Sequence, residues 1–372
     1  MTRLAMEHDA INLAQGFPNF PAPDVLKEAA VRAIRDDINQ YAVTWGAPRL
    51  RRALAQKYHE WYGMEVDPEA ELTVCCGATE AMVSTLMAIV DPGDQVVVFE
   101  PFYENYGPDA ILCGADPVFF PMDLGESLDL ERLAGVVSDR TRAIIVNTPN
   151  NPTGHVFSRV ELEGIAGLCR RHDAYVVTDE IYEHIAYDGP HIPVATLPDM
   201  RDRAITISGA SKTFGVTGWR IGTIVAPADV TNAIRKVHDF LTVGAPAPLQ
   251  EAVAVALEEL GPEYYADLAT AYRGRRDRVY SGLVEAGFRC EPPGGAYYIL
   301  ADFSDVSGLP DDEFATWLTA EIGVASVPGS SFYSQSAEGQ GRSMVRFAFC
   351  KTDDLLDEAV SRLQRIRAEA VG

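Results

Sequence analysis

The sequence predicts an α/β protein whose larger part is a mostly parallel β-sheet with helices on both faces. Short apolar runs alternate with longer amphipathic segments as far as about Leu260. Several of these runs end in loops rich in Gly, Pro or Asn. The chain of 372 residues is long enough for about two domains. Its 47% hydrophobic and 23% charged residues are typical of a folded globular protein.

Periodicity then places the elements in order. Strands are expected over residues 72–76, 95–99, 142–147, 174–178, 204–207, 221–226, 297–300 and 344–349. Helices are expected over residues 23–36, 50–62, 77–90, 158–172, 228–241, 248–260 and 262–286. Residues 11–20 contain too many turn-forming residues for a regular element. Cys75 and Cys76 are expected on the two faces of the first strand.

Composition and charge narrow the function classes. The formal net charge of −23 disfavours binding to nucleic acid or to an anionic membrane, because both need a basic face. The six cysteines are scattered without C-x-x-C spacing, as expected for reduced thiols in the cytoplasm. No apolar run has the length of a membrane span, and no signal-peptide core is present. We expect a cytoplasmic protein with no membrane or nucleic-acid partner.

One lysine lies where its amine should be poorly solvated. Lys212 follows the strand expected over residues 204–207 and is surrounded by small and hydroxylated residues, with Arg220 just before the next apolar run. A poorly solvated lysine loses its proton readily, and a neutral amine can form a Schiff base with an aldehyde. Taken alone, an ordinary surface lysine is the commoner explanation.

Two other strand ends suggest binding of charged groups. Gly77-Ala78-Thr79 joins a strand to a helix, where free backbone N–H groups and the helix dipole favour an anion. Asp179 ends a buried strand and would need a cationic partner there. The neighbouring Glu180, Glu183 and His184 have no second group of ligands, so we expect no metal.

Arg346 lies between apolar neighbours in an expected strand. A buried arginine is costly unless it meets a carboxylate, which its guanidinium group can bind through two hydrogen bonds. The residues alone leave two alternatives open: a structural salt bridge, or the carboxylate of a substrate.

Several motifs together resemble the pyridoxal-phosphate (PLP) dependent aminotransferases of fold type I, class I/II, and in particular the kynurenine, glutamine and methionine subgroup. They are N-L-A-Q-G-F-P-N-F at 12–20, the turn at 77–79, N-T-P-N-N-P-T-G at 147–154, D-E-I-Y at 179–182, S-G-A-S-K-T-F-G-V-T-G-W-R at 208–220 and V-R-F-A-F at 345–349. The resemblance implies a seven-stranded sheet in a large PLP-binding domain (37–260) and a small α+β domain (261–372). Residues 1–36 would form an N-terminal arm and part of the small domain.

The resemblance also implies a role for each matched residue. Lys212 would carry PLP as a Schiff base and move the proton of the reaction. The ring of PLP would contact Tyr103, Asn151, Asp179 and Tyr182. Its phosphate would be bound by Gly77, Ala78, Thr79, Ser208, Ser211, Arg220 and, from a neighbouring subunit, Tyr41. The substrate carboxylate would be bound by Gly16, Asn151 and Arg346.

Two positions depart from the pattern of this family. Gly209 stands where many relatives carry a phosphate-binding serine, so Ser208 or Ser211 is expected to replace it. Only ten residues precede the motif that begins near Ile11, whereas relatives usually have a longer arm.

The expected activity is transfer of an amino group from a neutral, apolar, aromatic or sulfur-containing L-amino acid to a 2-oxo acid. Residues 237–272, where dicarboxylate-specific relatives carry a second arginine, contain no Arg or Lys. The alternatives are a PLP-dependent C–S β-lyase and an N-succinyldiaminopimelate-type aminotransferase. A non-enzymatic PLP-binding regulator would need a DNA-binding module, for which the chain has neither length nor basic charge. Tyr41 implies a homodimer with shared active sites.

Overall fold

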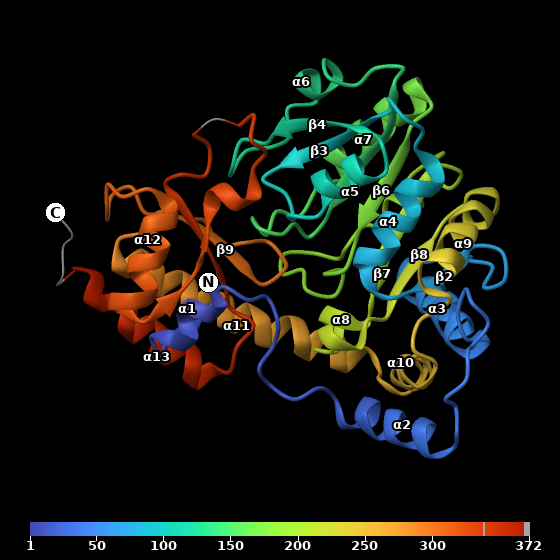
Figure 1. The fold of residues 1–372 in the computed structure, drawn as a ribbon, viewed down its shortest axis with the longest axis horizontal. Helices are drawn as coiled ribbons and strands as arrows, with labels where there is room; N and C mark the ends of the chain where they lie inside the picture. Colours follow the sequence, from blue (N-terminus) through green and yellow to red (C-terminus); the bar gives the residue numbers. More distant parts are fainter. Residues whose placement is uncertain (338, 368–372) are drawn as a thin grey trace.

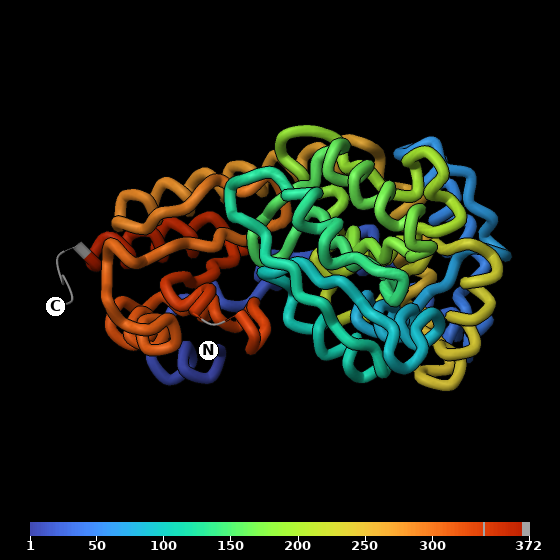
Figure 2. Tube along the Cα trace, turned by 90° about the horizontal axis from the view of Figure 1, so that it is seen from above, coloured from blue at the N-terminus to red at the C-terminus, as the bar shows by residue number. Residues whose placement is uncertain are grey.

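The computed structural model describes residues 1–337 and 339–367, which form two lobes (Figures 1 and 2). The larger lobe is built on a seven-stranded sheet of order β2-β8-β7-β6-β5-β3-β4. Its strands are β2 (Leu72–Cys75), β3 (Gln95–Glu100), β4 (Asp116–Pro121), β5 (Thr141–Asn147), β6 (Tyr175–Asp179), β7 (Ala204–Gly209) and β8 (Gly222–Val225). β3 to β7 pair in parallel, and β8 is antiparallel to both of its neighbours. The predicted fold class is confirmed.

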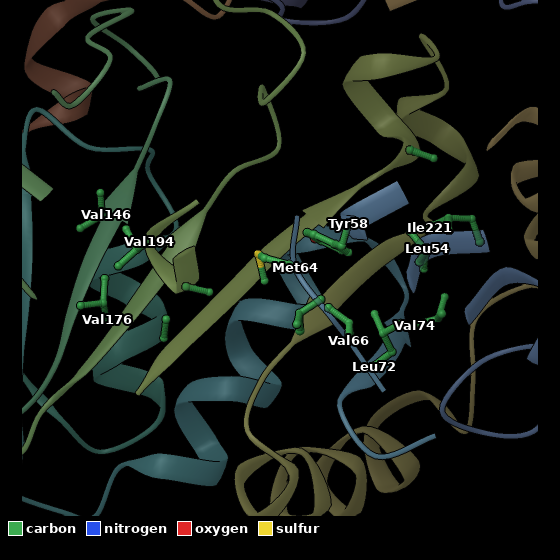
Figure 3. Close-up of a cluster of buried hydrophobic side chains, with 14 of the residues drawn as sticks. Leu54, Tyr58, Met64, Val66, Leu72, Val74, Val146, Val176, Val194 and Ile221 are labelled. Atoms are coloured by element: carbon green, nitrogen blue, oxygen red, sulfur yellow. The ribbon is translucent and has the colours of Figure 1, made fainter. Parts of the chain in front are cut away.

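Helices cover both faces of this sheet. They are α2 (Asp24–Arg35), α3 (Pro48–Tyr62), α4 (Gly77–Ile89), α5 (Tyr106–Leu112), α6 (Leu130–Ala134), α7 (Arg159–His172), α8 (Ala210–Thr213), α9 (Ala228–Thr242) and α10 (Ala247–Glu259). In β3, Val97 and Phe99 join one core while Val96 and Val98 join the other. Successive strand residues point to opposite faces, so a strand covered on both sides is apolar throughout. Figure 3 shows side chains of the first core from α3, β2, β5 and β6.

The smaller lobe combines two short sheets with helices. Its strands are β1 (Ile11–Asn12), β9 (Tyr298–Asp302), β10 (Val324–Ala325), β11 (Val327–Pro328) and β12 (Met344–Ala348). β11, β12 and β9 form an antiparallel sheet, and β1 pairs in parallel with β10. Its helices are α1 (Thr2–Glu7), α11 (Pro262–Ala286), α12 (Asp311–Trp317) and α13 (Asp353–Leu363). Short 3₁₀ turns cover Val194–Thr196, Thr217–Trp219, Gly329–Phe332 and Gln364–Arg367, and a π-helical turn covers Leu318–Ile322.

Local sequence signals set several helix ends. Ser158 caps α7 through a capping box with Glu161, each side chain bonding the other's backbone N–H. Pro262 begins α11, and Gly287 ends it in the left-handed conformation that glycine adopts without strain. α11 then runs from the large lobe, where Tyr264 donates to the Thr213 carbonyl, to the small lobe (Figure 1).

The structure differs from the sequence-based expectations near the N-terminus. Residues 11–12 do form a short strand, because their backbone pairs with β10, which lies more than 300 residues later in the sequence. Cys76 is not in the first strand: β2 ends at Cys75 and α4 begins at Gly77. α2 packs with the core of the large lobe. The division of the chain at residues 37 and 261 stays a prediction.

Candidate active site

A cavity of about 110 Å³ lies at the carboxyl edge of the large sheet. β5, β6 and β7 are parallel, so their last residues meet at this edge, where α/β proteins bind ligands. The cavity brings together nine residues proposed from the sequence: Ala78, Thr79, Tyr103, Asn151, Asp179, Tyr182, Ser211, Lys212 and Arg220. Motifs that are widely separated in the sequence therefore surround one space.

Lys212 lies in the single turn of α8, directly after β7. Its Nζ donates to the Gly16 carbonyl over 3.3 Å. Burial lowers the pKa of Lys212 to about 8, because an ammonium ion is poorly solvated there; Cys350 and Asp179 act in the opposite direction. A substantial fraction of this amine is therefore neutral, and nucleophilic, at mildly alkaline pH.

Asp179 lies buried at the end of β6. One oxygen accepts from the Tyr106 hydroxyl at 2.7 Å, and the other accepts from the Ile181 N–H at 3.2 Å. Burial raises the pKa of Asp179, and the hydrogen bond from Tyr106 opposes that rise. A protonated heterocyclic nitrogen is a partner that would stabilise the ionised carboxylate.

The opposite end of the cavity is suited to an anion. Gly77 begins α4 with φ of +85°, and a Cβ there would lie 2.1 Å from Nη2 of Arg220. The missing side chain lets the guanidinium group lie against the first turn of the helix. Arg220 donates to the carbonyls of Thr217 and Cys76 and, among the described residues, has no carboxylate partner. Its charge adds to that of the α4 N-terminus.

Arg346 borders the cavity from β12 in the small lobe. Its Nη1 donates to Oδ1 of Asn151 at 2.8 Å, and its Nη2 donates to the Ala14 carbonyl at 2.9 Å. Its guanidinium group lies 4.4 Å from the ring of Tyr298, and its Nε is buried without a partner. Within residues 1–337 and 339–367 it makes no salt bridge, so the structural alternative finds no support. An incoming carboxylate is the countercharge that it lacks.

Comparison with known proteins agrees with this geometry. A profile of the family described as "Aminotransferase class I and II" matches residues 8–363. The chain belongs to this family. The structure of N-succinyldiaminopimelate aminotransferase from Mycobacterium tuberculosis is similar with a TM-score of 0.94 and 40% identity, covering 98% of this chain and 96% of that one. A methionine aminotransferase from Escherichia coli has a TM-score of 0.93 and 38% identity, with 98% and 95% covered. Human kynurenine–oxoglutarate transaminase 1 is 36% identical, with 99% and 94% covered.

Aminotransferases of this family use PLP, and the cavity fits that cofactor. Lys212 offers a buried amine of lowered pKa for the aldehyde, and Asp179 a buried carboxylate for the pyridine nitrogen. Gly77 and Arg220, at the start of α4, would bind the phosphate. The aldehyde, the pyridine nitrogen and the phosphate of PLP would thus each have a matching partner.

Ser208 lies outside the cavity of this aminotransferase. Its hydroxyl donates to Oε1 of Glu183 at 2.6 Å, on the other side of β7. The prediction that its side chain replaces the phosphate-binding serine is therefore wrong, whereas Ser211 does line the cavity. A Cβ on Gly209 would lie 2.6 Å from the Ile221 carbonyl and 3.0 Å from Cα of Gly222. Close backbone contact between β7 and β8 explains the glycine.

Gly16 and Tyr41 are also not among the residues that line the cavity. The Gly16 carbonyl accepts from Tyr297 at 2.8 Å as well as from Lys212, and a Cβ on Gly16 would collide with the Tyr298 hydroxyl. Tyr41 is 84% exposed in this chain. Contact of Tyr41 with a phosphate therefore depends on a second subunit and stays a prediction.

Several polar residues of the site are not predicted from the sequence. Tyr106 bonds Asp179, and Asn147 accepts from the Asn151 N–H at 2.7 Å. The Tyr298 hydroxyl lies 3.1 Å from that of Tyr182. Asp109 lines the cavity with one oxygen unpartnered, and burial raises its pKa to about 6. Only the folded structure shows which of these polar side chains face the cavity.

A separate group of side chains has ligand atoms close enough for a metal: Cys75, Glu80 and His238. These atoms already have hydrogen bonds, since Nδ1 of His238 lies 2.9 Å from Glu80 and Nε2 lies 2.8 Å from the Thr44 carbonyl. Burial alone would lower the pKa of His238, but its two acceptors raise it. The contact between His238 and Glu80 therefore explains this group without a metal ion.

Proposed function

We propose that this aminotransferase moves an amino group from a neutral L-amino acid, with an apolar, aromatic or sulfur-containing side chain, to a 2-oxo acid. The observation that carries the proposal is the absence of Arg and Lys from residues 237–272. The cations that line or border the cavity, Lys212, Arg220 and Arg346, are each matched to PLP or to the α-carboxylate. A side-chain carboxylate would be left desolvated without a partner, at a cost of several kcal/mol.

The residues of the site have complementary tasks in this proposal. PLP, when bound, supplies an electron sink that weakens the Cα–H bond of the substrate. Arg346 and Asn151 hold the α-carboxylate and so orient that bond. Nζ of Lys212 takes the proton from Cα and later returns one. Asp179 keeps its negative charge beside the pyridine nitrogen.

A second candidate is transfer from N-succinyldiaminopimelate, favoured by the 40% identity to the M. tuberculosis enzyme. Its distal carboxylates would need a cation from outside the cavity, for example from a partner subunit. C–S β-lyase activity is a further alternative, because the same carbanion chemistry expels a leaving group from Cβ. Release of pyruvate from cystathionine-type substrates would identify a lyase.

We also propose a homodimer with shared active sites. Tyr41 (84%), Phe240 (91%), Leu241 (46%) and Val243 (44%) are exposed on two neighbouring segments. His238 joins these segments through the Thr44 carbonyl. A group of exposed apolar side chains next to the phosphate site favours an interface.

The proposed location is the cytoplasm, supported by the six free cysteines. Among the helices formed by residues 1–337 and 339–367, none combines the length and hydropathy of a membrane span. Cell fractionation followed by immunoblotting tests the location.

The proposed substrate class is tested with a panel of amino donors and several 2-oxo acids, scored by kcat/KM. Methionine, glutamine, phenylalanine and kynurenine represent the neutral class, with aspartate and N-succinyldiaminopimelate as charged comparisons. We expect at least one neutral donor to exceed aspartate by about tenfold or more, since an unpaired carboxylate costs more than 1.4 kcal/mol. A tenfold preference for aspartate would overturn the proposal.

A further inference from the structure

A second and larger cavity, of about 770 Å³, lies between the two lobes. We call it the junction groove. Its walls come from residues 122–129, 153–158, Ala186, 188–190 and Ile192 on one side and from residues 289–294, Leu300 and Met344 of the small lobe on the other. It shares no lining residue with the cofactor cavity. Its volume falls within the range, about 300–1,000 Å³, that is typical of small-molecule sites.

The groove adjoins the segments that carry Asn151 and Arg346, whose hydrogen bond links the lobes at the active site. Thr153 and Gly154 line it, and they belong to the loop that carries Asn151. In the small lobe, Leu300 is the cross-strand neighbour of Arg346, so their side chains share one face of the sheet. Both partners of the Asn151–Arg346 hydrogen bond are therefore attached to walls of the groove.

The two walls meet in tight contact at one end. The Gly295 N–H donates to the Gly154 carbonyl at 3.0 Å. A Cβ on Gly154 would lie 2.2 Å from Cβ of Pro293, and a Cβ on Gly295 would lie 2.6 Å from Pro149. Glycine at both positions lets the backbones touch. A molecule in the groove would therefore rest against a close-packed junction between the lobes.

The lining combines apolar surface with free negative charge. Phe120, Met122, Phe157, Ile192, Leu300 and Met344 supply apolar walls. Arg132 is already bonded to Asp123, and Arg289 to Asp302. The side chains of Glu126, Asp188 and Glu291 have no hydrogen-bond or ion-pair partner within residues 1–337 and 339–367. The uncommitted charge of the groove is thus negative, which attracts cations and repels the carboxylates of amino and 2-oxo acids.

We propose that the junction groove binds an organic cation with an aromatic body, and that this cation changes how the enzyme binds its amino donor. The apolar walls would hold the ring, and Asp188 and Glu291 would hold the positive charge. The effect on the donor rests on the proposed role of Asn151 and Arg346 in holding the substrate carboxylate. A ligand that touches both walls restricts their relative movement and so acts on that pair.

Binding is tested by isothermal titration of benzyltrimethylammonium into the PLP-loaded protein, because a quaternary ammonium cannot react with the cofactor aldehyde. We expect saturable binding, with uncharged benzyl alcohol binding more weakly. Asp188→Asn and Glu291→Gln should each weaken binding by about two- to fivefold, the usual effect of one exposed charge. Asp267→Asn, on α11 outside the groove, is the matched control. Absence of saturable binding, or equal binding by the Asp188→Asn and Glu291→Gln variants, would overturn the site.

The regulatory effect is tested by measuring KM for the best amino donor with and without saturating benzyltrimethylammonium. KM should change by about twofold or more, and the response should disappear in the Asp188→Asn/Glu291→Gln double variant. Bound cation with unchanged KM would refute the coupling. The titration does not use an amino donor, so an error in the proposed substrate class would leave its result unchanged.

Discussion

At the scale of single residues, the site leaves charged groups without a countercharge. Among the described residues, Asp179 and Arg346 are buried and Lys212 is half-buried, and none of the three forms a salt bridge with another side chain. Burying an unpaired charge is costly, so an ordinary core would not retain three of them. PLP and the substrate carboxylate would supply the missing partners.

The lowered pKa of Lys212 predicts how PLP uptake depends on pH. The neutral amine is the reactive form, so the uptake rate of the cofactor-free protein should rise with pH and reach half of its maximum near pH 8. An ordinary lysine would give a midpoint near about 10.4. Stopped-flow absorbance measures the rate, with PLP plus free lysine as the reference. A midpoint above pH 10 would contradict the buried environment.

Tyr298→Phe should shift the pH midpoint of the visible absorption band of the PLP-loaded protein upward. The Tyr298 hydroxyl lies 3.1 Å from that of Tyr182, and donation to Tyr182 would make Tyr182 a stronger donor to the cofactor's phenolic oxygen. Loss of one such bond, worth about 0.5–1.5 kcal/mol, corresponds to a shift of up to about one pH unit. Tyr175→Phe in β6, outside the cavity, is the control. An unchanged midpoint would show that the pair does not tune the cofactor.

At the scale of elements, the two sides of β7 contact different groups: a buried polar cluster on one side and the cofactor cavity on the other. Ser208 faces a buried group in which Glu183 also accepts from Lys57 at 2.6 Å and Tyr62 at 2.6 Å. The next residue, Gly209, permits the close approach of β8, and α8 then presents Ser211 and Lys212 to the cavity. The hydrogen bond of Ser208 thus holds the lysine segment on the side away from the cavity. Ser211 and Lys212 remain on the cavity side, where PLP would bind.

This division predicts opposite outcomes for two serine variants. Ser208→Ala should lower stability by about 1–2 kcal/mol, because a buried hydrogen bond to the charged Glu183 is lost, and should leave PLP affinity unchanged. Ser211→Ala should weaken PLP binding with little loss of stability. Urea denaturation of the cofactor-free protein and PLP titration measure the two quantities. Weakened PLP binding in Ser208→Ala, without loss of stability, would restore Ser208 to the phosphate site.

The elements also show what the sequence could predict. Strands such as β3 and β6 were identifiable because burial on both faces makes them continuous apolar runs. β1 was not, because two residues have no periodicity and depend on pairing with β10. The site motifs were found at loop positions, where polar residues and glycines are conspicuous. Tyr106, Asp109 and Tyr298 were missed, because their roles depend on which way a side chain points within a helix or strand.

At the scale of the whole molecule, the site lies where the two lobes meet, because Asn151 of one lobe is hydrogen-bonded to Arg346 of the other. Figure 2 shows the two lobes. Lys212 and Asp179 come from the large lobe, and Arg346 and Tyr298 from the small one. The extent of the small lobe is harder to predict from the sequence than that of the large lobe, because its core joins the N-terminal residues Ile11 and Leu13 to strands near the C-terminus. Such long-range pairing leaves no local pattern.

Shared active sites in a homodimer predict complementation between two damaged chains. Lys212→Ala removes the reacting amine of its own site, and Tyr41→Ala would remove a phosphate contact from the site of its neighbour. In a mixed dimer, one site should have both residues intact. Refolding equal amounts together should recover about a quarter of the normal activity, because half of the dimers are mixed and each has one good site. Recovery no greater than the sum of the separate variants would contradict shared sites.

The central claim is that Lys212 carries the cofactor of this aminotransferase, and borohydride reduction followed by peptide mass mapping tests it most directly. Reduction makes the link between PLP and its lysine permanent. The predicted result is a pyridoxyl group on the peptide that contains Lys212, and no label on Lys212→Ala protein treated in the same way. Stoichiometric labelling of another lysine, such as Lys57 or Lys351, or undiminished labelling of the Lys212→Ala protein, would contradict the account.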